Sequence, residues 1–152
     1  MTNITFEIVA IMLLIFVNGL FAMSEIAIVA ARKSLLKERA DRGNSKAKAA
    51  LELANQPNRF FSTVQIGITL VGILAGAFGG RTLATELSRY LAAVPYIQTY
   101  SDPIALGAVV ICITYLSVVI GELVPKRIAL GHAERIATFM AGPMRVVSKL
   151  AA

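Results

Sequence analysis

Apolar residues gather in three long runs, and most of the polar residues lie between them. The runs cover residues 4–31, 60–80 and 104–122. Each is long enough to cross the roughly 30 Å hydrocarbon core of a bilayer as a helix, which takes about 20 residues. The apolar content of 57% also exceeds the roughly 45–50% that is usual in soluble domains. The pattern therefore predicts an all-α integral membrane protein with three transmembrane helices.

Between the first two runs, residues 32–59 form a polar and strongly basic segment. The sequence Gly-Asn-Ser at residues 43–45 is typical of a turn, and Ser45 is a suitable N-cap for a helix that follows it. The segment predicts a helical hairpin at one membrane surface, with its second helix ending near Pro57.

After the third run, residues 126–150 are basic and amphipathic, which predicts a juxtamembrane helix near the membrane interface. Gly142 and Pro143 should bend or end that helix. A short amphipathic helix is predicted at residues 82–91, in the segment between the second and third runs. Residues 1–152 are then a single transmembrane domain.

The distribution of Lys and Arg predicts the orientation in the cell membrane. The hairpin holds eight of the 15 basic residues, residues 126–150 hold five, and residues 81–103 hold two. By the positive-inside rule, the hairpin and the C-terminal segment face the cytoplasm and the N-terminus lies outside. The net charge of +6 is therefore explained by basic residues that flank the spans and set the membrane topology. A nucleic-acid partner is not expected, because no basic patch is interleaved with aromatic residues.

The third run ends in Gly-Glu-Leu-Val-Pro-Lys-Arg, residues 121–127, which carries the candidate chemistry. Pro125 has no N–H, so the carbonyl of Gly121 four residues earlier loses its helical donor, and we expect the helix to break here. Glu122 places a carboxylate beside that carbonyl, at a depth where charge is costly. One interpretation is a pair of oxygen ligands for a hard cation. The other is a kinked helix end whose Glu122 pairs with a basic residue that follows it.

Polar residues also occur in the first two runs, most of them at about the depth of Glu122 in this topology. Because lipid would penalise them, we expect them to face the interior of the bundle. They are Asn18, Ser24 and Glu25 in the first run, and Gln65 and Thr69 in the second. Glu25 points about 100° away from Ser24 around the helix, so we expect it to tune the local field or to pair with a base.

Small residues repeat at a spacing of four in the second run, at Gly72, Gly76 and Gly80. This pattern lets another helix approach closely. The approaching helix is either another span of the same chain or a span of a second copy.

Two stretches together resemble the membrane domain of the cyclin M/CorC cation transporter family. They are Gly-Glu-Leu-Val-Pro-Lys at residues 121–126 and Asn-Gly-Leu-Phe-Ala-Met-Ser-Glu at residues 18–25. The resemblance covers nearly the whole chain. It implies a homodimer that exports Mg²⁺, with cytoplasmic CBS-type regulatory domains after the juxtamembrane helix. It also implies that Ser24, the Gly121 carbonyl and Glu122 contact the ion.

The chain departs from the pattern of this family at two positions. Many members have Ser where Ala22 stands and Asn where Ile68 stands. Two oxygen ligands are thereby missing, and Mg²⁺ needs near-octahedral oxygen coordination. Gln65, Thr69 or retained waters would have to supply the missing oxygens, or else this chain prefers another cation.

Three functions therefore stay open. The first is Mg²⁺ transport, driven by an ion gradient or the membrane potential because the sequence has no ATP-binding loop. The second is a dimerising membrane anchor for cytoplasmic regulatory domains. The third is export of organic cations such as polyamines, with Glu25 and Glu122 as charge partners. Transport is favoured over the anchor, because an anchor does not require Glu122 beside Pro125. An enzyme is not expected, since no Ser-His-Asp or Cys-His set is present.

Overall fold

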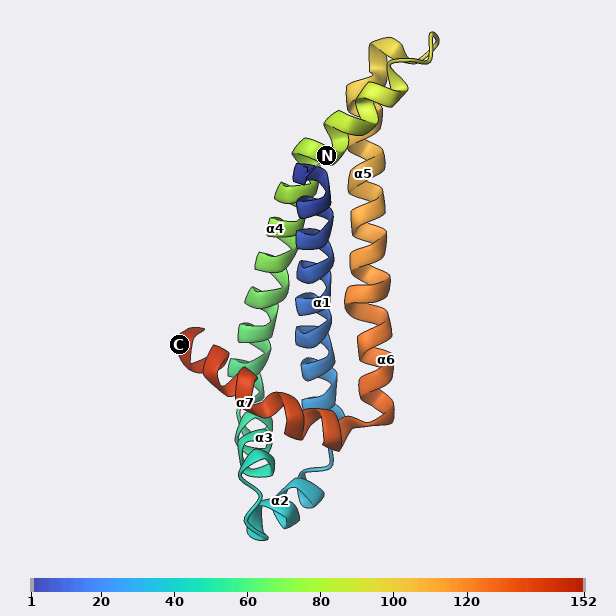
Figure 1. Cartoon of the computed structure of the whole chain (residues 1–152). Coiled ribbons are helices and arrows are strands. Elements are labelled where there is room, and N and C mark those ends of the chain that lie inside the picture. The colour runs from blue at the N-terminus through green and yellow to red at the C-terminus, as the bar shows by residue number, and fades with distance from the viewer. Residues whose placement is uncertain (1, 152) are drawn as a thin grey trace.

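The computed structural model describes residues 2–151, and side chains from residue 3 to residue 150. The regular elements in this part of the chain are all helical, as predicted (Figure 1). Element η1 is a 3-10 turn and η2 is a π-helical turn. In chain order the elements are α1 (Thr2–Ala30), α2 (Lys33–Asp41), α3 (Ser45–Asn55), α4 (Pro57–Leu91), η1 (Gln98–Tyr100), α5 (Ser101–Val118), η2 (Val119–Leu123), α6 (Val124–Gly131) and α7 (Ala133–Ala151).

Three helical stretches are long and apolar enough to cross a membrane: Asn3–Ala30, Pro57–Leu91 and Gln98–Gly131. They run along one another through the length of the molecule (Figure 1). Large apolar side chains such as Phe16 and Ile111 stay exposed on them, which suits a surface in contact with lipid. The chain is a multi-pass membrane protein, and its orientation stays a prediction.

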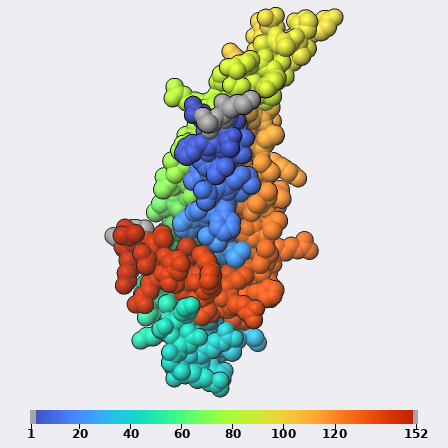
Figure 2. All heavy atoms as spheres, in the orientation of Figure 1, coloured from blue at the N-terminus to red at the C-terminus, as the bar shows by residue number. Residues whose placement is uncertain are grey.

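Helix α4 is longer than the second span predicted from the sequence. It continues past Gly80 to Leu91, and its 35 residues extend about 52 Å at 1.5 Å per residue. The separate helix predicted at residues 82–91 is therefore the far end of α4. No proline interrupts this part, and an ion pair of 3.3 Å joins Arg89 to Glu86 one turn earlier. Figure 2 shows the end of α4 and the start of α5 projecting beyond the start of α1.

The third span does not break at Pro125, contrary to the prediction. Elements α5, η2 and α6 form one continuous helix, in which the N–H of Val124 bonds to the carbonyl of Val119 five residues earlier. This wide turn accommodates the missing N–H of Pro125 without ending the helix. The Pro125 ring is buried against Gly19 of α1, where an added Cβ would lie only 3.1 Å from the ring.

The basic segment forms the predicted hairpin from α2 and α3. Its turn uses Gly43 at a φ of +91°, a conformation that glycine adopts without strain. The N-cap of α3 is Asn44 and not Ser45 as predicted. The Asn44 side-chain oxygen accepts hydrogen bonds from the N–H groups of Lys46 and Ala47 at 3.0 and 3.1 Å. The prediction missed by one residue, because Asn and Ser are both good caps and stand side by side.

Helix α7 crosses the spans at the end of the bundle that carries the hairpin, which we call the hairpin end (Figures 1 and 2). The predicted juxtamembrane helix, residues 126–150, is divided at His132 into α6 and α7, and α7 continues through Pro143. One face of α7 is buried against α1 and α3, and this packing holds the helix together at the proline. The buried residues on this face include Ala137, Met140, Ala141 and Met144.

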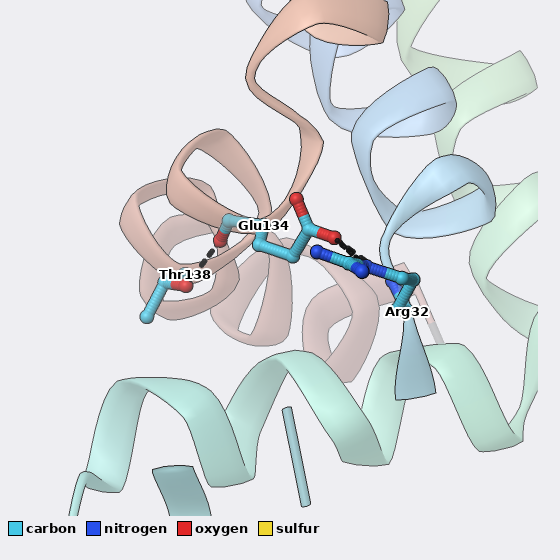
Figure 3. Close-up of polar contacts among 3 residues, drawn as sticks. All are labelled: Arg32, Glu134 and Thr138. Atoms are coloured by element: carbon cyan, nitrogen blue, oxygen red, sulfur yellow. Dashed lines mark hydrogen bonds and ion pairs between the residues drawn. The ribbon is translucent and has the colours of Figure 1, made fainter. Parts of the chain in front are cut away.

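An ion pair fixes the start of α7 to the corner between α1 and α2 (Figure 3). The Nε of Arg32 donates a hydrogen bond of 3.0 Å to a carboxylate oxygen of Glu134. This bond lowers the pKa of Glu134 below its ordinary value of 4.5. The Thr138 hydroxyl donates to the Glu134 carbonyl within α7. The contact therefore joins residues about a hundred positions apart in the sequence.

Candidate ion site

A buried hydrogen bond joins α1 to the π-helical turn of the third span. The side-chain amide of Asn18 donates to the Gly121 carbonyl at 2.9 Å. Both residues are buried. An added Cβ at Gly121 would lie 3.0 Å from the Asn18 amide nitrogen, so the close approach depends on a glycine. The Gly121 carbonyl, which was expected to be free because of Pro125, thus accepts a hydrogen bond from Asn18, a residue predicted to face the interior of the bundle.

The Glu122 carboxylate follows directly and is held by a lysine. Its Oε1 lies 2.7 Å from the Nζ of Lys126, and the same Nζ lies 3.7 Å from Oε2 of Glu25 on α1. The three side chains are between 28 and 39% exposed, so none of the charges is fully desolvated. One ammonium group shared by two carboxylates leaves a net charge of −1. The pairing of Glu122 with a following basic residue, which was one of the two interpretations, is present in this conformation.

A cavity of about 150 Å³ opens beside Glu122, between α1, α4 and the third span. A single water occupies about 30 Å³ in the liquid, so the cavity has room for a cation that keeps part of its hydration shell. Its polar side chains are Asn18, Ser117 and Glu122. The complete lining is Ile15, Asn18, Ile68, Val71, Gly72, Ala75, Ser117, Val118 and Glu122.

Ser24 does not line this cavity. Its hydroxyl is buried and donates to the Leu20 carbonyl in the same helix at 2.6 Å. It lies six residues beyond Asn18 along α1, a rise of about 9 Å towards the hairpin end. The structure therefore separates Ser24 from the Gly121 carbonyl, although the sequence predicted that both contact one ion.

Gln65 and Thr69 are exposed on α4 and also lie outside the cavity. The residue that α4 places there instead is Ile68, one of the two positions at which the chain departs from the family pattern. The other, Ala22, is fully buried on α1. The departure at Ile68 thus removes a side-chain oxygen from the cavity wall, and neither Gln65 nor Thr69 replaces it in this conformation.

Ser117 lines the cavity but was not among the predicted site residues. It lies four positions before Gly121, on the same face of the third span. This spacing was the signal that could have identified Ser117. A serine inside an apolar helix can also donate to its own backbone, so the spacing alone did not single it out.

The donors around this cavity suit a hard cation. Among the described residues, no group of three or more His, Cys, Asp or Glu side chains is placed to hold a metal ion. The cavity offers one carboxylate, one side-chain amide and one hydroxyl. Such oxygen donors bind Mg²⁺ together with retained waters. They also accept hydrogen bonds from an ammonium group, as Glu122 already does from Lys126.

Residues 9–152 match the family model described as the cyclin M transmembrane N-terminal domain. The chain is 52% identical to the UPF0053 protein sll0260 of Synechocystis over 151 residues, which is 99% of this chain and 34% of that protein. It is 34% identical to the polyamine export protein of Escherichia coli K12 over 139 residues, and 31% identical to the UPF0053 protein YhdT of Bacillus subtilis over 140. These matches cover 91 and 92% of this chain, and 31 and 30% of those proteins.

The chain spans about a third of the length of these curated relatives, so the matched part is a membrane domain of longer proteins. The family model covers nearly all of the chain, including the second and third candidate spans, most of the first, and the Gly-Glu-Leu-Val-Pro-Lys stretch that carried the resemblance. On this ground, the chain belongs to the cyclin M transmembrane N-terminal domain family.

Proposed function

We propose that this chain is the membrane domain of a cation transporter and that Mg²⁺ is the first candidate for the transported ion. The observation that supports the proposal is the polar group enclosed between three spans. Asn18, the Gly121 carbonyl and Glu122 meet beside a cavity in an otherwise apolar bundle. Carboxylates and buried amides inside membrane spans are costly and commonly mark an ion path.

Glu122 supplies the main attraction in this proposal. A carboxylate attracts a divalent cation far more strongly than a neutral oxygen does, and partial burial strengthens this attraction. Lys126 competes for the same carboxylate at 2.7 Å, so a cation that binds Glu122 must displace an ammonium group. Glu25 shares that lysine, and its role is to receive Lys126 when Glu122 binds the ion.

Ser24 belongs to a different position on the proposed path, nearer the hairpin end than the cavity. It lies towards the hairpin end from Asn18, on the side where Glu25 and Lys126 lie. Its oxygen keeps lone pairs for an ion, since the hydroxyl uses only its proton on Leu20. Gln65 and Thr69 would contribute only after a movement of α4, because both are exposed.

An organic polycation is the second candidate for the transported species. The group that Glu25 and Glu122 hold is an ammonium ion, which is the chemistry of a polyamine. The cavity wall also carries Ile68, which favours an alkyl chain over a cation that needs six oxygens. Some relatives of this chain are named polyamine export proteins, and this candidate extends that activity to the present chain.

The proposal includes the arrangement of the whole protein. We place the hairpin and α7 in the cytoplasm and the N-terminus outside, on the charge distribution. CBS-type regulatory domains would follow α7, in the two thirds of the relatives' length that this chain does not span. The proposed assembly is a homodimer. In an alternative function, the domain would only anchor such regulatory domains to the membrane.

Thermal unfolding of the purified full chain with increasing Mg²⁺ tests the proposal, because binding to the folded state stabilises it by mass action. We expect stabilisation of the unmodified chain, a weaker effect in Ser24→Ala, and almost none in Glu122→Gln. Glu38→Gln, which removes an exposed carboxylate of the hairpin, is the matched control. Spermidine in place of Mg²⁺ tests the second candidate with the same variants. If Glu122→Gln responds to both cations as the unmodified chain does, the result would favour the anchor function over transport.

A further inference from the structure

A second cavity, of about 200 Å³, lies at the hairpin end between α3, the first turn of α4 and the last turns of α7. We call it the basic pocket. It is separate from the ion site, with which it shares no lining residue. Its lining consists of Glu52, Leu53, Gln56, Arg59, Phe60, Arg145, Ser148 and Lys149.

Three cationic side chains converge on the basic pocket, against one carboxylate. Arg145 is paired with Glu52, at 3.4 Å between Nη2 and Oε2. Among the described residues, Arg59 donates only to the Ser148 carbonyl, at 3.5 Å, so its charge is not neutralised there. Lys149 makes no ion pair with any of the described residues. The pocket therefore keeps a net charge of +2 and unused N–H donors.

The start of α4 adds to this positive potential. The N-cap residue Gln56 and the residues Arg59 and Phe60 of the first turn all line the pocket. The Gln56 side chain makes no capping hydrogen bond, and the first turn contains no acidic residue. The first N–H groups of a helix lack partners within it and carry a partial positive charge, which attracts anions. In α4 these are the N–H groups of Asn58 and Arg59, because Pro57 has no N–H and the Gln56 N–H bonds to the carbonyl of Leu53 in α3.

The depth of the pocket agrees with that of a lipid headgroup. It lies where the apolar part of α4 begins, with exposed Ile66 and Leu70 about two and three turns further along the helix. α7 crosses the spans at the same level (Figure 1). Basic pockets between helices at this boundary are suited to phosphate headgroups of anionic lipids.

We propose that the basic pocket binds a phosphate group, and that the headgroup of an anionic phospholipid supplies it. The Arg59 guanidinium offers a planar fork for two phosphate oxygens, Lys149 a point charge, and the start of α4 its N–H groups. Glu52 keeps Arg145 in place and limits the charge of the pocket. A bound phosphate therefore joins α3, α4 and α7, and stabilises the position of α7 across the spans.

The test uses the full chain purified in a neutral detergent. Dioleoylphosphatidylglycerol is titrated in, and thermal stabilisation gives the apparent affinity, with dioleoylphosphatidylcholine as the neutral lipid. We expect saturable stabilisation by phosphatidylglycerol. Arg59→Gln and Lys149→Gln should each weaken the affinity about fivefold, the ratio that corresponds to about 1 kcal/mol per cation near the lipid surface. Lys37→Gln, at an exposed cation of α2, should leave it unchanged.

Inorganic phosphate distinguishes the two sources of the group. Stabilisation by millimolar phosphate with the same dependence on Arg59 and Lys149, and without an added effect of lipid, would keep the phosphate site and overturn the lipid as its source. Equal losses in Lys37→Gln and the two pocket variants would overturn the site, because binding would then follow the overall surface charge. Arg59→Lys, which keeps the charge and should retain part of the binding, separates a lost site from a misfolded variant.

Discussion

The side-chain amide of Asn18 donates a hydrogen bond of 2.9 Å to the carbonyl of Gly121, across 103 positions of sequence. The bond joins α1 to the only π-helical turn among the described residues. Turns of this kind inside α-helices frequently occur at functional sites. Here the turn leaves a backbone oxygen directed at a neighbouring helix, and a polar side chain meets it inside the membrane core.

Replacing Asn18 by Leu should destabilise the fold by about 1–3 kcal/mol, because the Gly121 carbonyl would remain buried without a donor. Thermal unfolding in mild detergent measures the change. Asn55→Leu is the control, since Asn55 is exposed at the end of α3. Equal stability of the two variants would mean that water satisfies the carbonyl.

Gly121→Ala should also be destabilising, by about 1–3 kcal/mol for overpacking. The added Cβ would lie 3.0 Å from the Asn18 amide and 3.4 Å from the carbonyl of Ile15, so α1 would have to move away. Gly107→Ala on α5 has nothing within 4 Å and should be neutral or slightly stabilising, because alanine favours a helix. A Gly121→Ala variant as stable as Gly107→Ala would contradict the close approach of α1.

Lys126→Gln should increase the affinity for the transported cation, because it frees Glu122 from its ammonium partner. The stabilisation curve should move to lower cation concentration, while Arg127→Gln, at the exposed neighbouring position, should leave it unchanged. The opposite result, weaker binding in Lys126→Gln, would indicate that the lysine holds Glu122 in its binding position.

The ion pair between Arg32 and Glu134 predicts a pH dependence. The pKa of Glu134 is lower in the folded chain than its ordinary 4.5, so the pair contributes its full stability above that value. The contribution is lost as the pH falls through the lowered pKa of the folded state. Glu134→Gln should therefore lower the unfolding temperature at pH 7, and the difference should shrink below pH 4.5. Arg32→Gln should reproduce both effects, and a difference that persists at low pH would assign the loss to packing.

The glycine positions of α4 provide a test of the proposed dimer. An added Cβ at Gly72, Gly76 or Gly80 meets nothing within 4 Å, and all three line an open groove of about 250 Å³ between α4 and α5. No atom of the described residues therefore packs against these added Cβ positions, which leaves room for a helix of a second copy. Gly76→Leu should shift a dimer to monomer in light scattering, while Gly107→Leu should not. A dimer that persists in Gly76→Leu would place the interface elsewhere.

The sequence was sufficient for the architecture, because three long apolar runs and a basic segment leave few arrangements in a bilayer. The family also followed from two short stretches. The cavity could not be predicted from the sequence, since its geometry depends on the rotation of each helix about its axis. Whether Ile68 or Thr69 faces the bundle, and whether Lys126 reaches both Glu25 and Glu122, depends on tertiary packing.

The π-helical turn could not be predicted for a similar reason. Pro125 alone predicts a break, whereas the bond from the Val124 N–H to the Val119 carbonyl shows that the helix continues. The length of α4 was missed because the apolar run ends at Gly80, whereas helical hydrogen bonding continues through the polar residues that follow. Hydropathy locates the part of a helix that lipid covers, and the helix itself can extend beyond it.

The π-helical turn also affects the phase of the whole third span. The least exposed positions of the span recur every four residues and form a stripe along it. In a regular α-helix, each step of four residues would rotate this stripe by about 40° around the helix. The wider turn reduces that drift between the two halves of the span. Regular α-helical winding of the same residues would turn the half beyond the π-helical turn by up to about 100° relative to α1, because this turn accommodates about one extra residue. The stripe comprises Ser101, Ala105, Val109, Ile113, Ser117, Gly121, Pro125 and Ala129.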